Sequence, residues 1–225
     1  MLSLIGGIVA AFFFGNVAAG ILHQAGTPGF KSEDGLGMVL LATLSFQGTA
    51  ILLGTIFLKT HDTPWREVFG ETNWKRCLGL AALALVVSVP VIWGLNCGSQ
   101  YLLDKLGWKL VDERAVELVM GAKSPWLMAY LIIFAVVLAP LGEEFFFRGL
   151  LFSLAKRYGW PKLGWFGVSF LFAAVHLNLP TFLPLFLLAL VLTWLYEKTE
   201  GLLAPVMAHS LFNLANLVVL LWQKH

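Results

Sequence analysis

Charged residues are scarce in this sequence. Only 12% of its 225 residues are charged, whereas 59% are hydrophobic, and the mean hydropathy is +0.81. This composition excludes a soluble globule whose polar residues cover a single core. The net charge of +2, without a basic cluster, gives no sign of nucleic-acid binding. We therefore expect an integral membrane protein.

Cysteine and N-terminal basic residues are scarce as well. The two cysteines, Cys77 and Cys97, bracket one predicted helix and lie 20 residues apart, about 30 Å by helical rise. They cannot pair with each other, and no disulfide framework or cysteine-based zinc site is implied. No Lys or Arg precedes Lys31, so the basic region of a cleaved signal peptide is missing, and the first apolar run is expected to be a retained span.

Long apolar runs dominate what is present. Seven of them approach or reach the roughly 20 residues that a helix needs to cross a bilayer. They cover residues 4–22, 37–58, 78–95, 126–155, 163–179, 182–196 and 201–222. We predict an all-α, polytopic transmembrane helix bundle with about seven to eight membrane helices in one integrated membrane domain. Residues 1–125 would supply N-terminal membrane helices and an interfacial segment at 101–120, and residues 126–225 a helical core.

The run at 126–155 is too long and too interrupted for a plain spanning helix. Pro140 cannot donate a backbone hydrogen bond, which is expected to leave the carbonyl of Val136 without its helical donor. Directly afterwards come two carboxylates, Glu143 and Glu144. A charged group at a bilayer centre costs roughly 2.5–3.5 kcal/mol, so an ionisable residue there is a candidate for a functional site.

The polar residues of three predicted helices share one depth in the membrane. Counted from the loops on one side, Glu143, His176 and Asn213 each lie 13 or 14 residues into an apolar run. At about 1.5 Å per residue each is roughly 20 Å from that face, with His209 one turn nearer to it. Structural polar groups placed independently would have no need to share a depth. The spacing therefore predicts that these four side chains meet.

Two further charged side chains accompany them. Glu144 and Arg148 stand four residues apart, which places them on one helix face and allows an ion pair. Glu143 points about 100° away from that face. Arg148 thus has a structural task, and Glu143 is the carboxylate most free for chemistry.

These residues belong to three short motifs, which follow one another along the chain and lie on apolar predicted helices. They are EExxxR at Glu143, Glu144 and Arg148, FxxxH at Phe172 and His176, and HxxxN at His209 and Asn213. The set resembles the CPBP family of intramembrane proteases, which is related to the type II CAAX prenyl endopeptidase and often called Abi proteins. The resemblance covers about residues 126–222, which would be the catalytic core, and the first 125 residues add generic spans.

The resemblance implies a catalytic set of four residues. Glu143 with His176 would activate a water for attack on a peptide carbonyl. His209 and Asn213 would donate hydrogen bonds to the developing oxyanion. Such roles suit a general base in an apolar setting and neutral donors to a tetrahedral intermediate.

Three residues are expected to support this set. Glu144 with Arg148 would hold the site, and Phe172 would shape the pocket wall. The structural alternative is that each histidine is an interhelical donor and that the carboxylates with Arg148 form only a buried charge network. Joint occurrence of the residues favours the catalytic interpretation.

The cofactor remains open at this point. A glutamate and two histidines, here Glu143, His176 and His209, are also a common zinc set with an open fourth position. The sequence lacks HExxH, and members of the similar prenyl endopeptidase group are thought to work without a bound ion. The first choice is therefore no required cofactor and no metal, with zinc as the alternative.

The sequence thus predicts an endopeptidase that hydrolyses a peptide bond of a membrane-anchored protein or peptide. It would reside in the lipid bilayer, as an integral protein of the bacterial cytoplasmic membrane, with no nucleic-acid partner. One alternative is a non-proteolytic membrane scaffold or bacteriocin-immunity protein. Another is a proton-coupled transporter, which predicts a repeated pair of broken helices that the sequence does not show.

Overall fold

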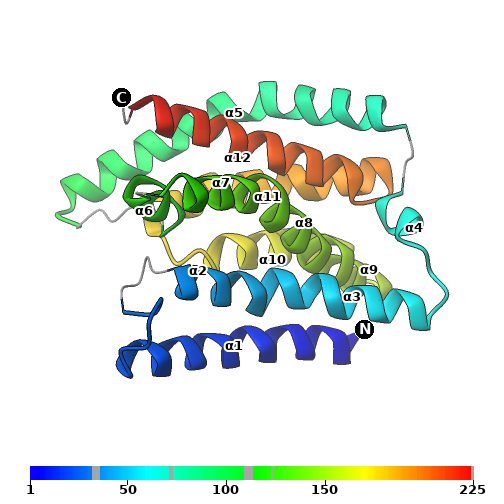
Figure 1. The fold of residues 1–225 in the computed structure, drawn as a ribbon. Coiled ribbons are helices and arrows are strands. Elements are labelled where there is room, and N and C mark those ends of the chain that lie inside the picture. The colour runs from blue at the N-terminus through cyan, green and yellow to red at the C-terminus, as the bar shows by residue number, and fades with distance from the viewer. Residues whose placement is uncertain (32–35, 71–72, 109–113, 123, 224–225) are drawn as a thin grey trace.

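The protein folds as a bundle of helices (Figure 1). The computed structural model describes residues 1–31, 36–70, 73–108, 114–122 and 124–223, and these contain helices and no strand. Residues 109–113, part of the predicted interfacial segment, lie outside the described part. The predicted all-α polytopic class is confirmed.

The N-terminal part contains two helical segments of membrane length that form a hairpin, followed by one longer helix. Their bounds are α1 (Leu2–Gln24), α2 (Leu36–Thr43), the π-helix η1 (Leu44–Gly48), α3 (Thr49–Thr60), α4 (Trp65–Phe69), α5 (Trp74–Lys105) and α6 (Arg114–Gly121). In Figure 1, α1 and α3 lie side by side at one edge of the bundle, while α5 lies at the opposite edge beside α12 (Leu203–Gln223).

Helix α5 is longer than expected. It has 32 residues and continues ten residues past the predicted end of the third span at residue 95. Polar side chains such as Asn96 end the apolar run there, but they are compatible with helix. The helix ends only before Gly107, whose φ of 72° favours glycine. Cys77 and Cys97 both lie on α5, 20 residues apart, and do not pair with each other, as expected.

The C-terminal part carries a nearly continuous but irregular helix, followed by three regular ones. Their bounds are α7 (Pro125–Ile133), η2 (Phe134–Leu138), α8 (Ala139–Glu144), η3 (Phe145–Phe152), α9 (Ser153–Arg157), α10 (Pro161–Ala174), α11 (Leu179–Thr199) and α12. The segments η2 and η3 are π-helical. This conformation is rare in proteins overall, but where it occurs it is frequently found at functional sites.

The π register changes which carbonyl loses its partner. The N–H of Ala139 donates to the carbonyl of Phe134, five residues back. In that register the next carbonyl, Ala135 O, would be paired with the N–H of residue 140, which is proline. In the π register the donor lost at Pro140 is that of Ala135 O. The prediction for Val136 O assumed an α-helical register and stays a prediction.

Six helices among the described residues are long and apolar enough to cross a membrane. The difference from the seven to eight expected lies mainly in α10, which has 14 residues. Its length of about 21 Å is shorter than the roughly 30 Å of a hydrocarbon core. The chain turns back at residues 175–178, so α10 is a short element packed beside α11.

The first hairpin is held by a close approach of two helices at a glycine. A Cβ added at Gly15 of α1 would overlap the Cβ and Oγ of Ser45 of η1, whereas one at Gly20 would meet nothing within 4 Å. We expect Gly15→Ala to lower the free energy of unfolding by about 1–3 kcal/mol through overpacking. Gly20→Ala is the matched control and should leave it within about 0.5 kcal/mol of wild type. Thermal unfolding in detergent micelles measures both, and equal effects of the two substitutions would contradict the packing described.

Candidate active site

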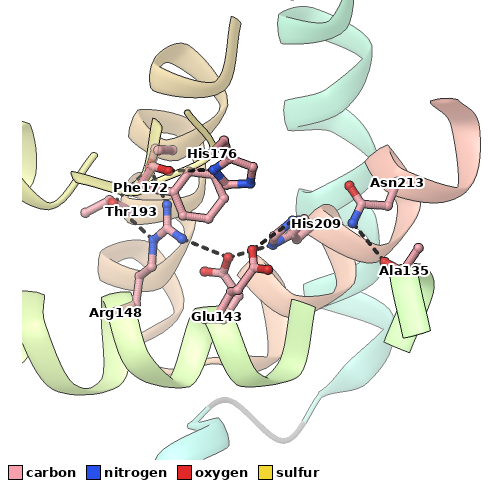
Figure 2. A network of polar contacts seen from close by, with 10 residues as sticks. Ala135, Glu143, Arg148, Phe172, His176, Thr193, His209 and Asn213 are labelled. Atoms are coloured by element: carbon pink, nitrogen blue, oxygen red, sulfur yellow. Dashed lines mark hydrogen bonds and ion pairs between the residues drawn. The ribbon is translucent and has the colours of Figure 1, made fainter. Parts of the chain in front are cut away.

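A fully buried ion pair lies at the centre of the bundle. Arg148 Nη1 donates to Glu144 Oε1 at 2.8 Å, and neither side chain is exposed at all (Figure 2). The two residues belong to η3 and α8 and stand four residues apart. The ion pair predicted from this spacing is present.

Helix α11 and a ring of α10 complete the surroundings of the guanidinium. Arg148 Nη2 donates to the carbonyl oxygen of Ala189 at 2.9 Å, and Nε donates to Thr193 Oγ1 at 3.4 Å. The guanidinium carbon lies 4.9 Å from the centre of the Phe172 ring, within cation–π range. Sequence reasoning missed both α11 partners, because a threonine in an apolar run and a backbone carbonyl carry no distinctive signal.

The same carboxylate also orients a histidine. Glu144 Oε1 lies 2.9 Å from His209 Nδ1 of α12. A carboxylate can only accept, so this bond places a proton on Nδ1 and leaves Nε2 as the free ring nitrogen. His209 Nε2 is 3.9 Å from Glu143 Oε2. Arg148, Glu144 and His209 thus form one buried chain of contacts that ends at Glu143.

The two neighbouring glutamates have different surroundings. The Glu144 side chain is completely buried, whereas that of Glu143 is 16% exposed. The roughly 100° between successive helix positions explains this, because one carboxylate faces Arg148 and the other faces away. Among the described residues Glu144 Oε2 has no hydrogen-bond partner, so Oε1 carries both contacts of that group.

His176 is held by the end of its own helix. Its Nδ1 lies 2.7 Å from the carbonyl oxygen of Phe172, one turn earlier. A carbonyl only accepts, so Nδ1 bears the proton here too and Nε2 is left free. The Phe172 ring lies 5.0 Å from the ring of His176 and 5.7 Å from that of His209. Phe172 thus packs against both imidazoles, but it is fully buried and is not among the residues that line the cavity, so its predicted role as a pocket wall stays a prediction.

Asn213 pairs with the irregular helix. Its Nδ2 donates to the carbonyl oxygen of Ala135 at 2.8 Å. This is the carbonyl that Pro140 and the π register leave without a helical donor. One of the two amide hydrogens of Asn213 is therefore used to complete the backbone of η2, a contact that the sequence did not predict.

These side chains meet at one cavity. Its volume is about 600 Å³, and its lining includes Glu143, His176, His209 and Asn213. The first comes from α8, the second from the turn after α10 and the last two from α12. The structure thus brings together the four residues that the shared depth predicted. The pair Glu144 and Arg148 lies behind them and is fully buried.

The described residues do not fit a ready zinc site. No group of three or more His, Cys, Asp or Glu side chains in this part of the chain is arranged to hold a metal ion. The zinc alternative would need Glu143, His176 and His209 to converge on one point. The contacts of the two histidines use Nδ1, with Phe172 O in one case and Glu144 Oε1 in the other, and leave Nε2 of each free. A histidine that binds a metal through Nε2 also makes such a contact, so these bonds do not decide between the two alternatives.

Removing one partner of the buried pair should be far more damaging than removing both. Arg148→Met leaves Glu144 as an unpaired buried charge, and we expect a loss of about 3–5 kcal/mol in the free energy of unfolding. Adding Glu144→Gln to Arg148→Met removes that charge, so the double variant should regain more than half of the loss. Thermal unfolding in detergent micelles measures the cycle, and a double variant no more stable than Arg148→Met would refute the buried pair.

Comparisons with known proteins find a family model and two partial relatives. Residues 125–215 match the family model of the type II CAAX prenyl endopeptidase Rce1-like proteins. An uncharacterized 24.3 kDa protein of Escherichia coli is 41% identical over 78 residues, which cover 32% of this chain and 36% of the relative. The UPF0177 protein YxdF of Lactococcus lactis subsp. lactis (strain IL1403) is 32% identical over 79 residues, which cover 35% of this chain and 43% of the relative.

The matches are therefore confined to a part of each protein. The chain spans about two fifths of the length of these curated relatives. No solved structure gives a significant match. The matched region contains the whole network from Ala135 to Asn213. Through residues 125–215, this integral membrane protein is thus similar to the type II CAAX prenyl endopeptidase Rce1-like family, a family of CAAX proteases.

Proposed function

We propose that the protein is an intramembrane endopeptidase that hydrolyses a peptide bond of a membrane-associated protein or peptide. One observation carries the proposal: a carboxylate, two imidazoles and a carboxamide line a single cavity among membrane helices. Buried polar groups at such depth are costly and mark functional sites. The family match supports peptidase chemistry in general.

Glu143 is the proposed general base. Its carboxylate lies at the cavity and lacks the arginine partner that occupies Glu144. It would take a proton from a water molecule whose oxygen attacks the carbonyl carbon of the substrate. The free Nε2 of His176 would accept a hydrogen bond from the other O–H of that water and so orient the water molecule. The proton held by Glu143 would then pass to the leaving nitrogen as the C–N bond breaks, giving a carboxylic acid and an amine.

Asn213 is the proposed principal donor to the oxyanion. Its amide has two hydrogens, and one of them is bound to Ala135 O. The second is available for a negative oxygen in the cavity and needs no change of protonation. His209 can donate from Nε2 only when that nitrogen carries a proton in addition to the one at Nδ1. We therefore place Asn213 first and His209 beside it.

Glu144 and Arg148 are the proposed positioning residues. They touch neither the cavity nor the reacting atoms, but they fix the ring of His209 through the bond to Nδ1. No step of this mechanism requires a metal ion or another cofactor. The proposed substrate is a membrane-associated protein or peptide, and the proposed location is the bacterial cytoplasmic membrane, since the relatives found are bacterial.

Replacing the general base tests the proposal. Glu143→Gln keeps the shape of the side chain but cannot accept a proton, so we expect cleavage to fall by at least about 100-fold. Comparative membrane proteomics of cells with the wild-type or the variant protein should show a precursor that accumulates in the variant. Glu67→Gln, at an exposed carboxylate of α4, is the matched control and should process normally.

Processing by Glu143→Gln at the wild-type rate would rule out this catalytic assignment. A non-proteolytic scaffold or immunity protein would give no precursor that differs between wild type and variant, because it cleaves nothing in either. Equal amounts of both proteins in the membrane and equal thermal unfolding temperatures establish that the comparison concerns chemistry.

The metal-free mechanism gives a separate expectation. The purified protein, treated with 1,10-phenanthroline or EDTA and then dialysed, should keep its full cleavage activity, because protein groups alone move the proton. Cleavage would be followed by mass spectrometry on the precursor that Glu143→Gln accumulates. Loss of activity that added zinc restores would instead support a zinc site at Glu143, His176 and His209.

A further inference from the structure

The cavity extends well beyond the catalytic set, along a wall of carboxamides. Six Asn or Gln side chains line it, together with apolar side chains from several helices. The carboxamides are Asn96, Gln100, Asn178, Asn213, Asn216 and Gln223. Two of them are on α5 and three on α12, and the α5 pair lies outside the region that matches the family. The family resemblance therefore does not explain this wall.

Hydrogen bonds between side chains use only some of the polar atoms of these amides. Trp93 Nε1 donates to Asn216 Oδ1 at 3.3 Å, which ties α5 to α12, and Gln100 Nε2 donates to Asn96 Oδ1 at 3.3 Å. Within the described part of the chain, the NH₂ groups of Asn96 and Asn216 and the Oε1 of Gln100 have no hydrogen-bond partner. Polar groups of this kind in a membrane bundle are unfavourable unless something pairs with them. Both donors and acceptors are thus presented to the cavity.

The wall carries no charge away from the catalytic end. Among the described lining residues, Glu143 is the one acidic side chain, and none is Lys or Arg. The same lining includes apolar side chains, among them Val116, Val119 and Leu217. A charged ligand group would lose its hydration here without gaining a partner. An uncharged ligand with alternating donors and acceptors would be satisfied.

An extended polypeptide has that alternation along its backbone. Asn213 and Gln223 are ten residues apart on α12, so the wall is about 15 Å long by helical rise. At about 3.3 Å per residue, this length holds about four to five extended residues. A hydrocarbon chain would match the apolar side of the cavity but would leave the amide groups unpaired.

We propose that Asn96, Gln100 and Asn216 form a substrate subsite that binds the backbone of an extended, uncharged polypeptide segment of about four residues on one side of the bond to be cleaved. The inference rests on the proposed function and specifies its substrate class. The amides would pair with main-chain N–H and C=O groups, as in strand addition to a sheet edge. The apolar wall would receive the side chains.

A peptide library tests the subsite without knowledge of the natural substrate. The full chain, reconstituted in vesicles of phosphatidylethanolamine and phosphatidylglycerol, is incubated with peptides from a proteolytic digest of a bacterial proteome, and new termini are identified by mass spectrometry. We expect sites with Asp, Glu, Lys or Arg within four residues on one side to be depleted at least tenfold. Equal cleavage of charged and uncharged sequences would overturn the proposal.

Variants of the wall give the second measurement. Asn96→Leu with Asn216→Leu should raise KM for the best library peptide about tenfold and change kcat less than twofold. Asn16→Leu is the matched control, because Asn16 is an amide of α1 whose Nδ2 bonds Phe12 O away from the cavity, and it should change neither constant. A double variant that cleaves as well as wild type would overturn the subsite, and this is the result expected if the wall holds a lipid chain.

A variant with a changed specificity gives a test that does not depend on the folding of the double variant. Gln100 is exposed at its end of the wall, so Gln100→Lys should be tolerated and should increase cleavage of peptides with Asp or Glu in the four-residue stretch about tenfold. No such increase would overturn the subsite. If the wild type cleaves no peptide, or Glu143→Gln cleaves as well as wild type, the proposed function itself fails instead.

Discussion

The buried carboxylate of Glu144 is the constraint on which the centre of the structure depends. One oxygen of this group accepts from Arg148 on η3 and from His209 on α12, and the arginine in turn reaches α11. A buried ion pair adds little net stability compared with well-packed apolar residues. Its consequence here is geometric, because it fixes the position and the tautomer of His209. The adjacent Glu143 is then placed at the cavity by the turn of the helix alone.

Irregular backbone at η2 and at the end of α10 positions other residues of the cavity. Membrane helices tolerate a broken hydrogen-bond pattern only where protein or a cavity satisfies the freed groups. The π register of η2 and the proline at residue 140 free the carbonyl of Ala135, and Asn213 donates to it. The short helix α10 ends within the bundle and leaves His176 at the cavity. Two departures from regular spanning helices thus open the space that the proposed chemistry needs.

Much of this site could be predicted from residue spacing. The pair Glu144 and Arg148 follows from the four-residue repeat of a helix, and the meeting of Glu143 with His176 follows from counting residues from the loops. Both inferences use the rise and turn of a helix, which vary little. They did not require knowledge of how the helices pack.

Features that depend on packing could not be predicted in the same way. The acceptor Ala189 O is a backbone atom, and its residue type gives no indication of the contact. Ala135 O lacks a helical donor because the π turn moves the carbonyl that faces residue 140 back by one residue, and the sequence does not reveal that turn. The length of α5 was underestimated because polarity marks the end of an apolar run, whereas Gly107 marks the end of the helix. The role of Asn96 and its neighbours emerged only when α5 lay against α12.

The central claim is that these polar side chains face one aqueous cavity inside the membrane. Thiol labelling in intact membranes tests it most directly, in a chain whose Cys77 and Cys97 are replaced by serine. N-ethylmaleimide, which is uncharged and reacts with thiolates in contact with water, should modify Asn213→Cys, which lies at the cavity, and leave Leu214→Cys unmodified, since that position faces outward from the bundle. Labelling of position 214 but not of position 213 would contradict the account.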